Sequence, residues 1–541
     1  MKKYSYYIYL LITSACASVA MPTGGPRDET PPELINSNPV NNQKNFKGNL
    51  LELEFNEDIK LKDPKEEILI TPSAGKETKF IAKKRKVNIE PELPWTDNTT
   101  YSISFRDGVQ DLTEGNPAEN LRLAFSTGPT IDSLMIYGKI TQTFADKIPE
   151  KITVAIYQAD TFDIFNHTPV YFTKTNKKGV YSIQNLKAGV YYIYAFDDKN
   201  KNLKVDSKTE KFTYQSTAIN LPAEKKDSIN LSLITVDARP IKISAIRSTD
   251  KTTRIRFNKQ TDSLKVLDLK KTEATYSYGE NKSELIFYQN FPKEDSLKVR
   301  LFAVDSVGSE IDTLIFLKYT ETKTAQEGFK TKEISARYNP INKSFTHKLS
   351  YSKPINQILY DSIKITYDST HIRNVGKENI KIDTLHNTLT LTTPIEIITP
   401  EGAKKPIQPV LTYSKGTLIS IESDSSKLIT AKIPVFTEDE TAIVSIKVKT
   451  TEANYEVQLI DKNETIIQSV KNVKEYTFRY LLPDEYKIRV LIDSNNNGKW
   501  DAGSFTKRID PEKFIKYISE EGKISFPIRA NWEYGPLLIE F

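Results

Sequence analysis

The stretch KKGVYSIQNLKAGVYYIYAFDDKN, residues 177–200, indicates which class of fold this chain adopts. Two runs in it, 180–186 and 190–196, are rich in branched and aromatic residues, and in the second run aromatic residues recur at every other position from Tyr192 to Phe196. A period of two is the pattern of a β-strand whose two faces meet different surroundings. Gly179 and Gly189 stand where the chain has to reverse its direction. The segment therefore predicts two strands separated by a turn.

Similar short runs recur along the whole chain. They are rich in branched and aromatic residues and are bounded by Asn, Asp, Gly or Pro, as in LLELEF (50–55), KITVAIY (151–157), TRIRF (253–257), LKVRLFAV (297–304) and YKIRVLI (486–492). Amphipathic stretches with a helical period do not exceed about two or three turns. At about 150 residues per domain, the 541 residues correspond to roughly three to five domains. The sequence therefore predicts an all-β protein made of tandem β-sandwiches.

The composition argues against an enzyme and against a nucleic-acid partner. The net charge is only +6 over 541 residues, which gives a weak electrostatic field. We expect the basic run KKRK (83–86) to be a solvated strand face. The glycines form neither of the phosphate-binding patterns GxGxxG and GxxxxGKS/T. Four histidines and one cysteine leave few combinations for nucleophilic or zinc chemistry, so we predict no catalytic residues.

The amino terminus predicts a lipoprotein signal peptide over residues 1–15. Lys2 and Lys3 provide the positive end, and the apolar segment that follows is too short to span a bilayer. Small residues lead directly into Cys16, the only cysteine of the chain, and this arrangement resembles a bacterial lipobox. The resemblance implies that Cys16 is diacylated, that the signal is cut before it, and that the new amine is acylated. The alternative is ordinary cleavage near Ala15, with Cys16 uninvolved.

A lipidated Cys16 would hold the protein on a membrane, because each buried methylene contributes about 0.8 kcal/mol. Residues 16–30 are rich in Pro, Gly and Thr, and we expect them to form an extended tether. No acidic residue directly follows the cysteine, which favours lipid anchoring in the outer membrane. The face of that membrane, periplasmic or external, stays open.

Residues 31–129 are expected to form the first sandwich. They contain a Phe-x-Glu corner after a strand (Phe55, Glu57), a Tyr-x-Ile strand and the turn DLTEGN (111–116). These features resemble bacterial Ig-like domains of the S-layer type. With the preceding PTGGPRDETPP (22–32), they also resemble a family of Bacteroidota lipoproteins that begin with such a tether and an Ig-like domain. The resemblance implies an exported, lipid-anchored protein.

The remaining domains are expected to be of two sandwich types. Residues 130–236, with a GxYxI strand, an Asn-Leu-x-x-Gly turn and a YxIxAF strand, resemble prealbumin-like or carboxypeptidase-regulatory-like sandwiches, which are structural and interaction modules. Residues 237–322 resemble a second Ig-like sandwich, and residues 323–437 form a β-rich domain of unknown type. Residues 438–541 return to the prealbumin-like pattern. We expect the two types to alternate along the chain.

Two loops have the oxygen spacing of an EF-hand calcium loop. In DSNNNGKWD (493–501), Gly498 occupies the sharp turn, and the candidate ligands are Asp493, Asn495, Asn497, Lys499 (through its carbonyl) and Asp501. The glutamate at position 12 of such loops is missing, so only weak calcium binding is expected. A less favourable loop, in which Leu203 replaces the glycine, offers Asp198, Asn200, Asn202 and Asp206. The alternative for both loops is a hairpin connection in which Asp and Asn accept bonds from backbone amides.

A further pattern, Asp-Ser/Thr followed by an aliphatic residue, recurs through the chain. It resembles the O-glycosylation acceptor of exported Bacteroidota proteins and gives the candidate acceptors Ser133, Ser228, Ser263, Ser296, Ser306, Thr313, Ser362 and Thr384. The alternative is turn chemistry, in which Asp-Ser ends a loop and the aliphatic residue opens a strand.

These observations predict a non-enzymatic lipoprotein anchored to the outer membrane through Cys16. It would act as a scaffold or binding subunit whose partner is an envelope protein or a glycan, because sandwich edges and end loops are common binding surfaces. No nucleic-acid partner is expected, and calcium is the only cofactor that the motifs suggest. The alternative is an accessory or catalytic component of envelope polysaccharide or peptide processing. Convergence of histidines or carboxylates in one pocket would favour that alternative.

Overall fold

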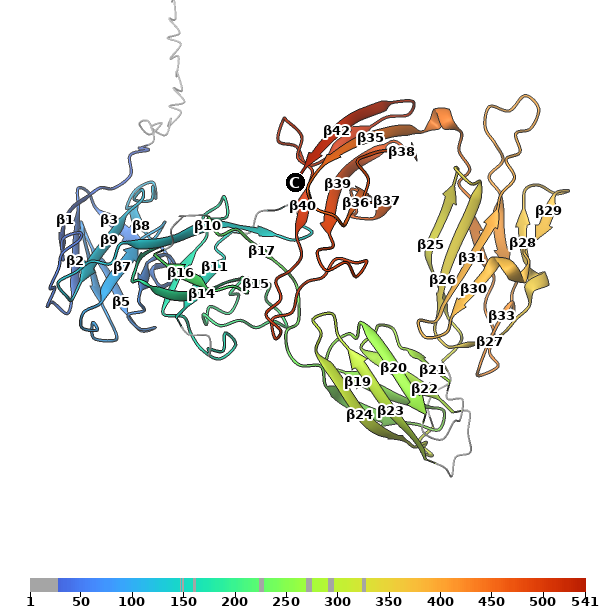
Figure 1. Ribbon diagram of the computed structural model, residues 1–541, viewed down its shortest axis with the longest axis horizontal. Helices are drawn as coiled ribbons and strands as arrows, with labels where there is room; N and C mark the ends of the chain where they lie inside the picture. Colours follow the sequence, from blue (N-terminus) through green and yellow to red (C-terminus); the bar gives the residue numbers. More distant parts are fainter. Residues whose placement is uncertain are drawn as a thin grey trace, which may run out of the picture.

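The computed structural model describes residues 28–541 except 146, 148–149, 159–161, 223–227, 269–274, 290–295 and 324–326. Within these residues the strands form five successive sandwich domains (Figure 1). The α-helical content of the described chain is a single turn, α1 (Pro64–Glu67). The prediction of an all-β protein made of tandem sandwiches is confirmed.

The first sandwich packs two sheets around one core. Its strands are β1 (Leu34–Asn38), β2 (Leu51–Phe55), β3 (Ile59–Leu61), β4 (Leu69–Thr71), β5 (Lys79–Lys83), β6 (Lys86–Glu90), β7 (Thr100–Ser104), β8 (Val109–Asp111) and β9 (Arg122–Ser126). One sheet has the order β1-β2-β6-β5 and the other β4-β7-β9, while β3 pairs with β8. Phe55, Phe105 and Phe125 are fully buried in the core of this domain. The KKRK run lies at the β5–β6 connection and is exposed to solvent.

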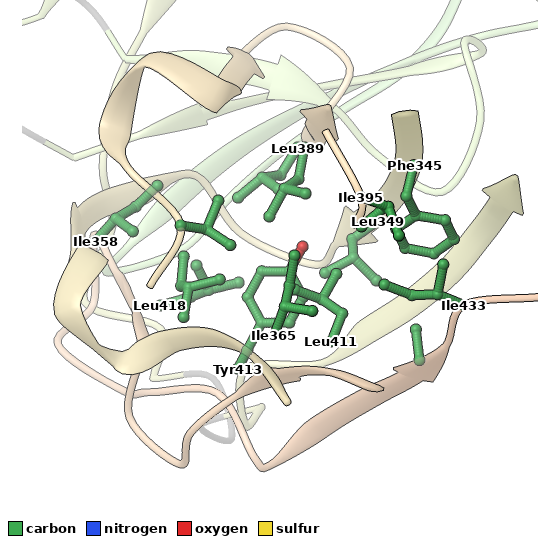
Figure 2. Close-up of a cluster of buried hydrophobic side chains, with 14 of the residues drawn as sticks. Phe345, Leu349, Ile358, Ile365, Leu389, Ile395, Leu411, Tyr413, Leu418 and Ile433 are labelled. Atoms are coloured by element: carbon green, nitrogen blue, oxygen red, sulfur yellow. The ribbon is translucent and has the colours of Figure 1, made fainter. Parts of the chain in front are cut away.

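The fourth sandwich repeats the strand order of the first. Its strands are β25 (Thr331–Asn339), β26 (Ser344–Tyr351), β27 (Ile355–Ile358), β28 (Ile363–Thr366), β29 (Ile372–Asn374), β30 (Ile380–Asp383), β31 (Thr388–Pro394), β32 (Val410–Tyr413), β33 (Leu418–Ser420) and β34 (Ile429–Lys432). Its sheets are β25-β26-β31-β30 and β29-β28-β32-β34, and β27 pairs with β33. Apart from the extra edge strand β29, each pairing has a counterpart in the first domain. Figure 2 shows its core, where Phe345, Leu349, Ile365, Leu389 and Leu411 meet.

The third sandwich is a shorter version of the same arrangement. Its strands are β18 (Ile243–Ser248), β19 (Thr252–Phe257), β20 (Ser263–Asp268), β21 (Tyr276–Tyr278), β22 (Glu284–Tyr288), β23 (Leu297–Val304) and β24 (Glu310–Leu317). The sheets have the orders β18-β19-β22-β21 and β20-β23-β24. They correspond to the two main sheets of the first domain.

The second and fifth sandwiches share a different strand order. The second contains β10 (Leu134–Gln142), β11 (Thr153–Tyr157), β12 (Tyr171–Lys174), β13 (Val180–Leu186), β14 (Gly189–Phe196), β15 (Phe212–Tyr214), β16 (Ile219–Leu221) and β17 (Leu231–Leu233). The fifth contains β35 (Ala442–Lys449), β36 (Tyr455–Asp461), β37 (Ile466–Lys471), β38 (Glu475–Leu481), β39 (Asp484–Ile492), β40 (Phe514–Lys516), β41 (Phe526–Ile528) and β42 (Glu533–Glu540). The sheets β13-β10-β17 and β12-β11-β14-β15 of the second match β38-β35-β42 and β37-β36-β39-β40 of the fifth. In each domain the first and last strands pair in parallel.

The turn within residues 177–200 carries the chain from one sheet to the other, because β13 and β14 belong to different sheets.

The order of domain types along the chain differs from the expectation. Since the third and fourth domains are of the same type, strict alternation is wrong. Many sequences can adopt one strand-pairing order as long as the side chains that point into the core are apolar. The fourth domain can therefore share the strand order of the first without sharing its local motifs.

A buried ion pair joins the first two domains. Glu67, at the end of α1, is 3% exposed, and its carboxylate accepts bonds from Arg106 Nε at 3.0 Å and from Lys151 Nζ of the second domain at 2.6 Å. The Arg106 guanidinium also donates to the carbonyls of Lys174 and Thr175 in the second domain, at 2.6 and 3.1 Å. One arginine therefore binds groups of both domains.

The charge of Glu67 should make this junction sensitive to acid. Burial acts to raise the pKa of Glu67, but the bonds from Lys151 and Arg106 outweigh it and hold the pKa below its ordinary value of about 4.3. The stabilisation is therefore present above that ordinary value and is lost as the pH falls through the lowered pKa. We expect hydrogen exchange at residues 171–175 to accelerate over this acidic range, beyond the intrinsic pH effect. Glu67→Gln should remove the pH dependence; an unchanged pH dependence in Glu67→Gln would contradict this assignment.

The fifth domain folds back onto the second, so the five sandwiches do not form a linear string (Figure 1). Tyr214 Oη of β15 donates to the Ile509 carbonyl at 2.6 Å. The fifth domain also contacts its other neighbour, since Arg337 of β25 donates to the Ile466 carbonyl at 3.0 Å. Because the fifth domain contacts both the second and the fourth, domains two to five are arranged in a ring.

Candidate functional site

The predicted lipidation site, Cys16, lies outside the described residues, as do the signal peptide 1–15 and most of the tether 16–30. In the part of the chain that the structure covers, no helix is both long enough and apolar enough to cross a membrane. The lipid anchor therefore stays a prediction.

The loop 493–501 is the first part of the connection, residues 493–513, between the paired strands β39 and β40. The carboxylate of Asp493 accepts bonds from the amides of Asn497 at 3.0 Å and Gly498 at 2.8 Å. Asn495 and Asn497 both donate from their side-chain amides to Asp501, and the side-chain oxygen of Asn497 accepts a bond from the Lys499 amide at 3.0 Å. Gly498 has φ +87°, a conformation that favours glycine. All predicted ligand residues thus come together in one compact turn.

A glutamate that sequence spacing missed completes this loop. The carboxylate of Glu512 accepts bonds from the amides of Asn495 at 3.1 Å and Asp501 at 2.9 Å. The Glu512 carbonyl accepts a bond from Trp500 Nε1 at 2.9 Å. Residues 502–511 separate Glu512 from the motif, so a fixed spacing cannot find it.

The loop 198–206 of the second domain has the same construction. Asp198 accepts bonds from the amides of Asn202 at 3.0 Å and Leu203 at 3.1 Å. Glu210 takes the place of Glu512, accepting bonds from the amides of Lys199 at 3.0 Å and Asp206 at 2.9 Å. Leu203 adopts φ +58° in the position of the glycine. Burial, aided by Asp198, raises the pKa of Glu210 although backbone amides oppose it.

Hydrogen bonds engage the candidate calcium ligands of both loops. In each loop, carboxylate oxygens that could bind calcium accept bonds from N–H groups. Among the described residues, no group of three or more histidine, cysteine or acidic side chains is placed to hold a metal. Calcium binding stays a prediction, and the hairpin alternative accounts for the observed bonds.

Calcium binding can be tested on the full chain. If the loop 493–501 opens to bind the ion, calcium at ten times the dissociation constant should stabilise the fifth domain by about 1.4 kcal/mol. Asp493→Ala should abolish this increment, and Trp500 fluorescence should report binding. Asp461→Ala removes a carboxylate that also accepts loop amides, at Asn463 and Thr465, and serves as the control. No calcium-dependent change in Tm or fluorescence up to about 10 mM would exclude the weak site.

The residues between Asp501 and Glu512 form a docking hairpin, defined here as residues 502–511. Ser504 and Ile509 pair through two backbone bonds of 2.9 Å, which places Phe505 at the tip. Phe505 enters an aromatic cluster of the second domain, with ring centroids 5.4 Å from both Phe165 and Tyr214. The docking hairpin thus supplies one part of the contact between the two domains.

Polar contacts fix the docking hairpin on the second domain. The Asp510 carboxylate accepts bonds from the amide and the hydroxyl of Ser216, at 2.6 and 2.8 Å. Arg508 lies over the ring of Tyr192, 5.0 Å from its centroid. The second domain in turn contributes Phe144, whose ring packs edge-on against Trp500 of the fifth domain, with 5.0 Å between the ring centroids. The contact is therefore reciprocal.

Lys499 extends these contacts to the third domain. Its ammonium lies 3.1 Å from Asp262 and 3.6 Å from Asp501. The bond with Asp262 is the main reason that the pKa of Lys499 is raised. A residue predicted as a calcium ligand through its carbonyl thus contacts another domain through its side chain.

The histidines lie apart in the described chain: His167 is in the second domain, and His347, His371 and His386 are in different parts of the fourth, where His386 lines a cavity at the junction with the third domain. His347 lies between Tyr413 Oη at 3.1 Å and Glu333 at 3.0 Å, but His347 and Tyr413 are both 0% exposed in the core of the fourth domain. Burial lowers the pKa of His347, and Glu333 only partly opposes this. His371 and His386 are bonded to acidic residues elsewhere in that domain. The buried His347 is therefore out of reach of a substrate.

The candidate glycosylation acceptors are accessible to different degrees. Thr313 and Ser362 are half-buried, and the exposed ones are Ser133, Ser228, Ser263, Ser296, Ser306 and Thr384. Asp227, which precedes Ser228, lies outside the described residues. Glycosylation stays a prediction, because exposure fits both a modified residue and a turn.

Comparison with known proteins bears on the first domain. Residues 28–127 match the family of bacterial Ig-like domains. The third and fourth domains have the strand order of this Ig-like domain, so we describe them as Ig-like as well. No curated protein matches the chain.

Several solved structures resemble parts of the chain at low similarity. Dimeric latent PorU from Porphyromonas gingivalis is 9% identical, with a TM-score of 0.23, and the match covers 57% of this chain but only 36% of PorU. Domains 1–6 of the surface-layer protein SbsC are 11% identical, with a TM-score of 0.16 and coverage of 92% and 68%. The Bacillus cereus pilin subunit BcpA is 9% identical, with a TM-score of 0.12 and coverage of 75% and 99%. Scores this low carry no argument about function.

Proposed function

We propose that this protein is a non-enzymatic scaffold or binding subunit of the bacterial cell envelope, held at the outer membrane by a lipid on Cys16. The observation that carries the proposal is the docking of the fifth domain onto the second. Phe505, Asp510 and Phe144 connect two domains that are far apart in the sequence. A scaffold needs a fixed spatial arrangement of its binding surfaces, and this closure supplies one.

The nature of the described surface supports a binding role. The Ig-like domains and the second sandwich type are joined so that loops and strand edges are exposed, and such surfaces commonly bind partners. Glu67 and His347, which are themselves buried, make contacts between domains and within a domain, respectively. An envelope protein or a glycan is the partner that we propose.

Lipid anchoring is tested by fractionation. Cys16→Ala should move the protein from the membrane fraction to the soluble periplasm or the medium, because the acyl chains provide the attachment. Ser18→Ala, two residues away, should leave the protein in the membrane fraction. Mass spectrometry of the mature amino terminus should find an acylated cysteine. A Cys16→Ala protein that stays in the membrane would contradict the anchor.

The binding role is tested by purification of the tagged protein from detergent-solubilised membranes, followed by mass spectrometry. A subunit should bring down a partner in fixed stoichiometry, and Phe505→Ala should weaken that association. Turnover of a glycan, ester or peptide substrate, abolished by one point substitution, would overturn the non-enzymatic assignment.

A further inference from the structure

A large cleft separates the third and fourth domains. Its volume is about 950 Å³. One wall is built by β18 and β19 of the third domain, with Arg247, Arg254 and Arg256. The other wall includes Lys330 and Lys332 at the start of β25. Positive side chains thus line both walls of the same cavity.

The charges in the cleft are not balanced. Arg247, Arg254, Arg256, Lys330 and Lys332 face only three carboxylates, those of Glu280, Glu284 and Glu327. Glu284 is shared, since it lies 3.3 Å from Arg254 and 3.2 Å from Arg256. Within the described residues, Arg247, Lys330 and Lys332 form no ion pair. An anion entering the cleft would therefore meet cations that protein carboxylates do not neutralise.

Contacts at the base hold the two walls in place. The Asn387 side chain of the fourth domain donates to Ser277 Oγ of the third at 2.9 Å. The Tyr278 amide donates to the Leu385 carbonyl at 2.7 Å, and Leu385 packs against the core of the third domain. The cleft is therefore a preformed feature of the junction, which lowers the entropic cost of binding.

A buried acceptor provides an independent reason to expect a ligand. Asn387 lines the cleft and is only 5% exposed, yet its Oδ1 has no hydrogen-bond partner among the described residues. Leaving a buried acceptor unpaired costs about 1–3 kcal/mol, so a ligand or water that donates a bond would be favoured there. The lining also includes Asn281, Ser283, Ser350 and Ser352, which bind hydroxyl groups well. The site thus combines unneutralised cations with groups that recognise hydroxyls.

We propose that this cleft binds an acidic glycan, with carboxylates of sugar residues on Arg247, Lys330 and Lys332 and sugar hydroxyls on Asn387 and the serines. This assignment rests on the proposed binding function and names the class of its partner. A uronic acid polymer carries both kinds of group on each residue, whereas a neutral glycan lacks the charge and a polyphosphate lacks the hydroxyls. The cleft volume suits a short segment of such a chain rather than a globular protein.

The test is titration calorimetry on the full-length mature protein with three probes. Oligogalacturonate should bind, while a maltooligosaccharide of equal length and inorganic polyphosphate should bind at least about tenfold more weakly. Affinity for oligogalacturonate should fall as ionic strength rises from about 0.05 M to about 0.3 M, because partly exposed charges are screened.

Charge reversal locates the site. Arg247→Glu and Lys332→Glu should each weaken oligogalacturonate binding at least about tenfold, since each replaces an attraction by a repulsion. Lys265→Glu, an exposed substitution on the other sheet of the third domain, is the matched control and should change affinity less than about twofold. Circular dichroism confirms that each variant is folded.

Three results would overturn the proposal: no binding of oligogalacturonate, equal binding of the neutral oligosaccharide, or equal loss in Lys265→Glu. Preferential binding of polyphosphate would assign the cleft to phosphate-bearing polymers instead. Each of these outcomes leaves the membrane fractionation of Cys16→Ala and the co-purification of a protein partner unaffected. Failure of the cleft proposal is thus distinguishable from failure of the proposed function.

Discussion

Replacing Arg106 with alanine is expected to loosen the junction between the first two domains by about 3 kcal/mol. The change removes the bond to Glu67 and both bonds to carbonyls of the second domain. Removing one member of a buried ion pair costs about 3–5 kcal/mol, because the other charge stays buried. Lys151 remains bonded to Glu67, so we expect the lower end of this range.

Hydrogen exchange with mass spectrometry measures this effect on the full chain. Protection at residues 64–68 and 171–175 should fall about a hundredfold in Arg106→Ala, while protection in the fourth domain should not change. Arg106→Lys keeps the charge but not the planar fork of donors, and it should rescue only part of the loss. Arg85→Ala breaks an exposed pair with Asp58 at 3.9 Å and serves as the control, with an expected effect below about 1 kcal/mol. Equal effects of Arg85→Ala and Arg106→Ala would show that the junction does not depend on this bond.

Replacing Phe505 with alanine is expected to release the docking hairpin from the second domain. The ring contacts Phe165, Phe212 and Tyr214 of that domain, at centroid distances of 5.4, 6.1 and 5.4 Å. Truncating a fully buried phenylalanine costs about 3–5 kcal/mol. Phe505 is half-buried, so we expect about 2 kcal/mol, which shifts the docked-to-open ratio about thirtyfold.

Small-angle X-ray scattering should detect the opening as a larger radius of gyration. Limited proteolysis should cut residues 502–511 faster, since the hairpin no longer lies on the second domain. Adding Asp510→Ala removes the bonds to Ser216 and should increase both effects. Phe316→Ala, at a phenylalanine that is 62% exposed in the third domain, is the control. Unchanged scattering in the double variant would mean that other contacts hold the fifth domain in place.

The fold class was predictable because strand periodicity is a local property. Runs such as 151–157 and 486–492 became β11 and β39, and the recurring Asp-x-Asn-x-Asn motif correctly marked equivalent loops in two domains. The type of the fourth domain was not predictable, since its strand order equals that of the first without a shared motif. The order in which strands pair depends on contacts between strands that are far apart in the sequence, and these contacts cannot be identified from one sequence alone.

The residues of the candidate sites were also predictable only in part. Asp493 and Gly498 were identified from spacing, because a tight turn is determined by residues within it. Glu512 and the cleft walls at Arg247 and Lys332 were not, because each is brought to its site by chain segments that are distant in the sequence. The role of residues 502–511 becomes visible only in their packing on the second domain, through Phe505.

The sequence by itself therefore determined the β-strands and the loops that connect them, since each depends on residues close together along the chain. Lipid attachment at Cys16 stays a prediction from the same kind of local pattern. Only the tertiary structure decided that Phe505 bridges the fifth and second domains and that the cations of two Ig-like domains line one cleft. The physical reason is that domain docking depends on complementary surfaces. Their complementarity exists only after each sandwich has folded and buried its own core.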